Sequence, residues 1–240
     1  MNGRTWVRYA TVCLAVAGLV SCGTHDEAPK RDESVTGALK AARSEVAAAG
    51  SARIEATSST GTSLSSRSVG VLRWSGGLRG TLRVTTTGGS MASTTRLMGG
   101  SPSQARFLPD AYYTRMTDKF AALSDGKHWI RYPYDPGADL SPAASLKLLL
   151  SSGDAREVGR ETVHGVRATH YTGSADGQRV DVWIDRGHLL VKRVQRADTA
   201  SGAFSGTVHY ADYGARASAE RPPARDTVDF KDVVNRKPAA

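Results

Sequence analysis

A two-residue alternation of apolar and polar side chains recurs along most of the chain after residue 52, and it restricts the fold more than any other feature. Between Leu78 and Val84, the even-numbered residues are apolar or glycine, and the odd-numbered residues are Arg or Thr. Such a segment places its apolar residues on one face of a strand. The segments are short and end at Gly-containing turns, a cadence that predicts an antiparallel meander. We expect strands near residues 68–74, 78–84, 94–98, 105–108, 111–116, 127–132, 163–171, 179–185, 189–195 and 204–213.

Two segments depart from this alternation and predict helices. From Val35 to Val46 apolar residues recur at helical spacing, with Ser34 or Thr36 available as N-cap and Gly50 placed where a helix would end. A second helix is expected to begin at Pro142. It must be buried, or must line an apolar space, because it carries Leu146, Leu148, Leu149 and Leu150.

The N-terminal segment has a basic start, an apolar centre and a cysteine. Arg4 and Arg8 precede an apolar stretch over residues 9–20. This stretch is shorter than the roughly 20 residues of a spanning helix and fits a secretory signal. It ends in Leu19-Val20-Ser21-Cys22, which resembles the lipobox of bacterial lipoproteins. In that family the cysteine receives diacylglycerol and becomes the first residue after cleavage. A plain secretory signal with a chance cysteine is the alternative.

The lipobox resemblance implies three parts: a signal peptide over 1–21, a lipidated Cys22 with a flexible polar tether over 22–34, and a single domain over 35–240. Cys13 would leave with the signal and Cys22 would become a thioether, so no disulfide would staple the fold. The general secretory route and acylation would anchor the protein to the outer face of the cytoplasmic membrane. Loss of Arg4 and Arg8 would lower the formal charge from +9 to +7.

The remaining basic charge does not indicate a nucleic-acid partner. The Lys and Arg residues are scattered, without a run of five or more, and an exported protein does not meet nucleic acid. Attraction to anionic lipid headgroups or to acidic wall polymers is the functional interpretation of the charge.

The sequence contains no recognisable catalytic or metal-binding constellation. His164 and His170 lie too far apart on a strand to hold one ion alone, and neither HExxH nor GxSxG occurs. Asp181 and Asp185 fall on the polar phase of their strand, which we interpret as a charged outer face. We therefore expect no enzyme activity, no metal and no cofactor.

Three segments of the C-terminal half resemble actinobacterial LolA-like lipoproteins. They are ETVHGVRATHY at 161–171, VDVWIDRGHLL at 180–190, and TVHYADYG at 207–214, followed by Arg-Pro-Pro at 221–223. The resemblance implies an α+β fold of the LolA/LppX/LprG type, a curved antiparallel half-barrel sheet with helices packed in its concave face. It also implies a non-enzymatic protein that binds or carries lipids, lipoproteins or lipoglycans.

The expected function is therefore a membrane-anchored lipoprotein that binds or transfers a lipid or other hydrophobic ligand. An apolar cleft under the helices would be lined by Leu82, Val84, Leu146, Leu149 and Leu150. The alternative is a non-carrier interaction or sensor lipoprotein of the cell envelope, with a filled core and a protein partner.

Overall fold

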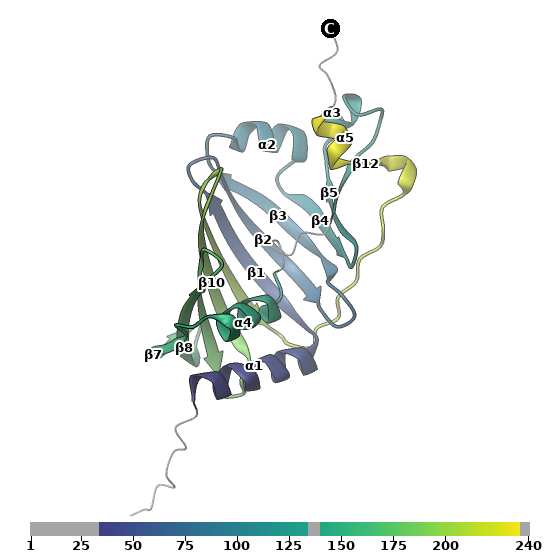
Figure 1. The fold of residues 1–240 in the computed structure, drawn as a ribbon. Coiled ribbons are helices and arrows are strands. Elements are labelled where there is room, and N and C mark those ends of the chain that lie inside the picture. The colour runs from purple at the N-terminus through teal and green to yellow at the C-terminus, as the bar shows by residue number, and fades with distance from the viewer. Residues whose placement is uncertain (1–33, 134–139, 236–240) are drawn as a thin grey trace, which may run out of the picture. The chain divides into compact units, whose positions relative to one another are not determined.

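A computed structural model describes residues 34–133 and 140–235 of the chain. The predicted signal peptide, Cys22 and nearly all of the tether lie outside the described residues. The described part contains one sheet of twelve strands and five α-helices (Figure 1). None of these helices has the length and apolarity needed to cross a membrane.

The elements from α1 to β7 cover the chain from Val35 to Val163. In chain order they are α1 (Val35–Ala49), β1 (Ser51–Thr60), β2 (Leu64–Arg73), β3 (Arg79–Gly88), α2 (Ala92–Gly99), β4 (Ser103–Leu108), β5 (Ala111–Arg115), α3 (Asp118–Ala122), β6 (Trp129–Pro133), α4 (Pro142–Ser151) and β7 (Arg156–Val163). The remaining elements are β8 (Val166–Ala175), β9 (Gln178–Asp185), β10 (Leu190–Thr199), β11 (Gly202–Ala211), β12 (Thr227–Asp229) and α5 (Phe230–Val234).

The sheet is open and almost entirely antiparallel. Its strand order is β12-β6-β5-β4-β3-β2-β1-β11-β10-β9-β8-β7, so β1 and β11 join the two meanders in the middle. The exception is β12, which pairs in parallel with β6 through Thr227–Asp229. The predicted curved half-barrel with helices in its concave face is confirmed (Figure 1).

Two glycines allow β2 and β3 to approach closely. A Cβ on Gly70 would fall 2.2 Å from the carbonyl oxygen of Thr81, and one on Gly80 would fall 2.1 Å from that of Val71. Gly80 also has a φ of 155°, in a region that other residues rarely adopt. Glycine within a strand commonly marks such a backbone approach or a bend.

Helix α1 follows its sequence signals closely. The Ser34 hydroxyl accepts a hydrogen bond from the Gly37 N–H at 3.1 Å, and Gly50 ends the helix with a φ of 69°. A side-chain oxygen at the N-cap and glycine just past the end are the usual physical determinants of helix termini. The helix buries Ala38, Leu39, Ala42 and Val46.

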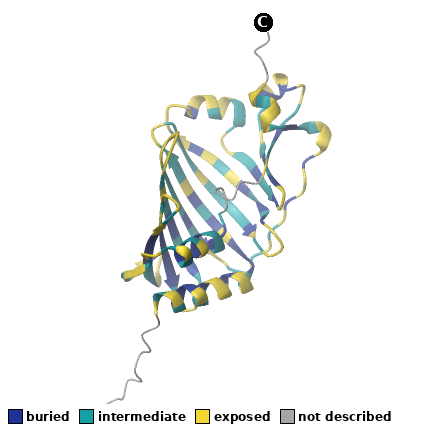
Figure 2. Cartoon of the chain, in the orientation of Figure 1, coloured by how far each residue is buried: buried dark blue, intermediate teal, exposed yellow. Residues whose placement is uncertain are grey.

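Most of the core lies between one end of the sheet and the two helices that cross it. Helices α1 and α4 pack against each other and cover the concave face there, and the strands beneath them are the most deeply buried (Figure 2). From the sheet, this core receives Ile54, Leu72, Leu82, Val182 and Leu190, among others.

The strand expected at 94–98 is wrong, because these residues belong to helix α2. Ala92, Thr95 and Met98 are three residues apart and are its more buried positions, so the period is helical. The β-branched Thr94 and Thr95 suggested a strand, but β3 already pairs with β2 and with β4. No sheet edge is left there for another strand, and α2 caps that end of the sheet instead (Figure 1).

Candidate ligand-binding groove and pocket

The five residues expected to line a cleft occupy two kinds of environment. Leu82, Leu146 and Leu149 are at most 1% exposed and belong to the main core. Val84 and Leu150 are only partly buried and pack against the edge of that core. Helices α1 and α4 therefore pack on the sheet through buried side chains, which fill the space between the helices and the strands.

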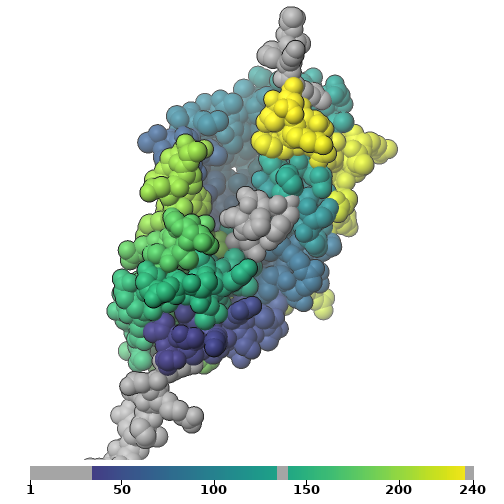
Figure 3. Space-filling view, viewed as in Figure 1, coloured from purple at the N-terminus to yellow at the C-terminus, as the bar shows by residue number. Residues whose placement is uncertain are grey.

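The part of the concave face beyond α4 is hollowed. Figure 3 shows a recess between the β10–β11 hairpin and α5, with residues of β2 and β3 at its back. Cross-strand register places Val84 beside Ser68 of β2 and Ser103 of β4 on this face. The same face carries Ser58 and Ser66, whose hydroxyls are 3.0 Å apart. We call this recess the concave groove. The side chains on its floor are small, and several of them carry hydroxyl groups.

An aromatic row lies on the same concave face of the sheet, across β4, β5 and β6. Phe107, Tyr112 and Tyr132 are cross-strand neighbours on β4, β5 and β6, and their ring centroids are 5.8 and 4.5 Å apart. Phe230 of α5 extends the row, with its centroid 4.9 Å from that of Tyr132. Phe107 shares its strand face with the core residue Ala105, so the row is on the concave side. Burial raises the pKa of Tyr132, so its hydroxyl stays neutral.

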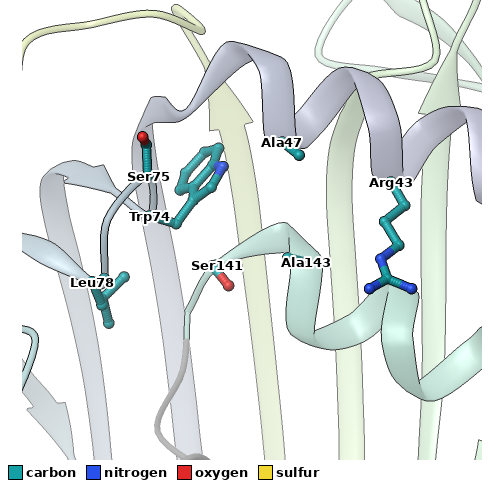
Figure 4. Close-up of a pocket in the computed structure, with 8 residues that line it drawn as sticks. Arg43, Ala47, Trp74, Ser75, Leu78, Ser141 and Ala143 are labelled. Atoms are coloured by element: carbon teal, nitrogen blue, oxygen red, sulfur yellow. The ribbon is translucent and has the colours of Figure 1, made fainter.

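A separate pocket of about 430 Å³ lies outside α4, where α1 and the β2–β3 turn meet the start of that helix (Figure 4). Helix α1 contributes Arg43 and Ala47, α4 contributes Ala143, and Ser141 is the N-cap residue of α4. The turn contributes Trp74, Ser75, Gly77 and Leu78. We call this the end pocket. None of the five residues predicted from the sequence lines it, because it is formed by helix ends and a turn.

A polar cluster on the convex face corrects the interpretation of Asp181 as a solvated charge. Asp181 is 4% exposed, and its carboxylate is 3.0 Å from both His170 Nε2 and Arg196 Nη1. Burial alone would raise the pKa of Asp181, but hydrogen bonds from Thr172 and His170 lower it overall. Asp185, by contrast, is partly exposed and accepts hydrogen bonds from its own turn.

The outer face of β9 is covered, which explains the burial of Asp181. Trp183 packs there with Val163, Ala168 and Val194 in a small hydrophobic cluster. Its indole also stacks on His170 and faces the Lys192 ammonium, at 4.2 and 4.0 Å. In the sequence, Trp183 lies on the same side of the strand as Asp181 and Asp185. A tryptophan at such a position indicates that this face of the strand is covered.

The other histidines on this face do not form a metal centre. His164, in the β7–β8 turn, stacks on His209 of β11 with ring centroids 4.1 Å apart. Within residues 34–133 and 140–235, no group of three or more His, Cys, Asp or Glu side chains is arranged to hold an ion. The arrangement around His170 consists of a hydrogen bond to Asp181 and ring stacking on Trp183.

Comparisons with known proteins agree with this fold. No protein-family model matches the chain. It is 44% identical over 229 residues to "Putative lipoprotein SCO4650" of Streptomyces coelicolor, an alignment covering 86% of this chain and 80% of the relative. It is 37% identical over 246 residues to a 31.2 kDa protein from the rplA-rplJ intergenic region of Streptomyces griseus, covering 84% of this chain and 81% of that protein.

Two solved mycobacterial lipoproteins are similar in structure. LprF from Mycobacterium bovis has a TM-score of 0.51 at 12% identity, covering 78% of this chain and 96% of LprF. LppX from Mycobacterium tuberculosis has a TM-score of 0.49 at 13% identity, covering 79% of this chain and 100% of LppX. The likeness to LprF shows a common fold. The chain therefore belongs to the family of the Streptomyces coelicolor lipoprotein SCO4650, and its fold is that of the LolA-like lipoproteins.

Proposed function

We propose that this protein is a lipoprotein anchored through Cys22 to the outer face of the cytoplasmic membrane, where it binds an amphiphilic lipid in the concave groove. The family membership and the lipobox support the anchor. The observation that carries the ligand proposal is the concave face of the sheet, where an aromatic row on β4–β6 lies beside a hydroxyl-rich patch on β1–β4.

The aromatic row and the hydroxyl-rich patch suit the two parts of an amphiphile. Acyl chains against Phe107 and Tyr112 would gain about 25 cal/mol per Å² of apolar surface removed from water. Hydroxyls of Ser68 and Ser103 could hydrogen-bond the polar portion, because hydroxyl groups both donate and accept. The protein would thereby shield a lipid from water while it crosses the envelope. Little energy is needed to release the lipid, because a bilayer solvates the same chains.

The anchor is tested by replacing its cysteine. Wild-type protein expressed in a streptomycete host should partition into the detergent phase and carry a diacylglycerol mass on its N-terminal peptide. Cys22→Ala should lack that mass and remain uncleaved. A Cys22→Ala protein that is processed and detergent-soluble like the wild type would contradict the proposed anchor and favour a plain secretory signal.

The ligand is tested by purification from the native host, organic extraction and mass spectrometry. We expect a co-purifying lipid that is lost in Val84→Glu, because a carboxylate would be placed on the groove floor. Thr85→Glu is the matched control, since Thr85 is exposed and one residue further along the same strand. Circular dichroism would verify folding of both variants. Absence of lipid from the wild-type protein, or equal lipid in both variants, would refute the groove assignment.

A non-carrier role is the second candidate. It is favoured by exposed apolar side chains at the sheet end opposite α1, where Met91, Leu97, Leu123, Phe230 and Val234 are each 41–63% exposed on or beside α2, α3 and α5 (Figure 1). Such side chains suit a protein partner. In vivo crosslinking of a lipid-free protein, lost in Leu97→Glu together with Leu123→Glu, would support this candidate instead.

A further inference from the structure

The end pocket combines one cation with apolar walls. Arg43 projects from α1 toward α4 at one side of the pocket, and Trp74 lies on the other side (Figure 4). Its volume of about 430 Å³ falls in the lower part of the range of small-molecule sites. It can therefore admit the end of a ligand, and it would not enclose a whole two-chain lipid.

The charged side chain among the lining residues of the end pocket is a cation, Arg43. Arg43 makes no ion pair with any other residue of the described ranges. Glu45 is the single acidic residue of α1, and it lies about 200° around the helix from Arg43. Helix α4 contains no acidic residue, and it begins at the pocket with Ser141, whose side chain does not cap it. The N-terminal end of a helix carries positive partial charge, so the start of α4 adds positive potential here.

The apolar side of the end pocket is rigid. The Trp74 indole N–H donates to the Val46 carbonyl at 2.9 Å, and its ring meets that of Tyr213 edge-on at 6.2 Å. These contacts fix the ring beside Leu78, which is 7% exposed. A ligand gains more from a wall that is already ordered, because no side-chain entropy is lost on binding.

We infer that the end pocket binds the anionic end of an amphiphile, with a phosphate or carboxylate at Arg43 and the adjoining methylenes against Trp74 and Leu78. A membrane phospholipid and a free fatty acid both have this chemistry. The site shares no lining residue with the concave groove, so it stands or falls separately from the lipid-binding function proposed above.

The inference is tested by NMR on the domain with ¹⁵N-labelled tryptophan, following the Trp74 indole signal, which Trp74→Phe would assign. The probes are dihexanoylphosphatidic acid and octanoate, with dihexanoylphosphatidylcholine and inorganic phosphate as comparisons. We expect one of the two amphiphilic anions to shift the Trp74 signal saturably, and the probe that does so identifies the source. The Trp129 and Trp183 signals should stay in place and report an intact fold.

Two variants separate the charge from the cavity. Arg43→Gln should weaken binding by about tenfold or more, the effect of losing one charge-assisted hydrogen bond. Its matched control is Lys40→Gln, which removes the same charge from a position of α1 that does not line the pocket and should change binding by less than about twofold. Ala47→Leu keeps Arg43 but fills the pocket, and it should also weaken binding.

Three results would overturn the inference. The first is that neither anion shifts the Trp74 signal. The second is that Arg43→Gln binds as tightly as the wild type, or that the zwitterionic phosphatidylcholine binds as tightly as the anions, because the cation would then be irrelevant. The third is that inorganic phosphate binds as tightly as the amphiphiles, because the apolar wall would then contribute nothing.

Discussion

Gly173 of β8 lies directly beneath Leu149 of α4. A Cβ built on Gly173 would come within 2.9 Å of Leu149 Cδ2 and 2.6 Å of the Ser152 hydroxyl. The absence of a side chain at this one position allows α4 to rest on the second meander. Helix α4 in turn forms part of the end pocket and covers the main core.

The substitution Gly173→Ala should therefore displace α4 and destabilise the domain by about 1–3 kcal/mol, the usual cost of overpacking. Urea unfolding of the purified domain would measure the change. Gly153→Ala is the matched control just beyond the same helix, because a Cβ there meets nothing within 4 Å. Equal midpoints for the two variants would show that α4 tolerates the methyl group.

Leu146 and Leu150 should respond differently to truncation, although both lie on α4. Leu146 is fully buried, so Leu146→Ala should cost about 2–5 kcal/mol through lost burial and a residual cavity. Leu150 is only partly buried, so Leu150→Ala should cost clearly less. Denaturant midpoints would compare them. A small cost at Leu146 would mean that it borders an open space.

Asp181→Asn should lower the free energy of unfolding at neutral pH by about 1–3 kcal/mol, because a buried acceptor for His170 and Arg196 becomes a partial donor. The pKa of Asp181 is lowered in the folded protein. Its ionised form therefore stabilises the fold above the unfolded pKa near 3.8, and this stabilisation is lost as the pH falls through the folded pKa.

The difference between the wild type and Asp181→Asn should accordingly shrink in acid, and unfolding at a series of pH values would show it. Asp176→Asn, in an exposed turn, is the control, because asparagine tolerates its positive φ of 52°. A constant difference at all pH values would exclude the linkage to Asp181.

His209 should make the fold sensitive to weak acid. Its pKa is lowered by burial, and further by His164 and Lys192, with Glu55 opposing them. A histidine with a lowered folded pKa stabilises the fold above its unfolded pKa of 6.5, and this contribution is lost as the pH falls through the folded pKa. The wild type should therefore lose stability as the pH falls below 6.5.

His209→Gln should reduce that loss, measured as the change of the thermal unfolding midpoint with pH. His188→Asn, in the β9–β10 turn, is the matched control for the loss of a histidine away from this cluster. The linkage would be contradicted if His209→Gln kept the full pH dependence.

The sequence alone predicted those features of the fold that depend on interactions between residues close together in the chain. Ser34 and Gly50 determine the ends of α1, because a cap and a left-handed residue are local properties. Pro142 begins α4 for the same kind of reason. The alternation in β9, β10 and β11 predicted their strands, and the resemblance of their motifs to those of LolA-like lipoproteins implied the half-barrel.

Only the tertiary structure decided which surfaces are covered. Alternation assigned Asp181 to an outer face, but the cluster around Trp183 buries it. The pattern of leucines could not show that Leu82, Leu146 and Leu149 fill the core, since burial depends on how closely Gly173 lets α4 approach. The concave groove and the end pocket are gaps between elements distant in sequence, and their size follows from sheet curvature and helix placement, which no local pattern encodes.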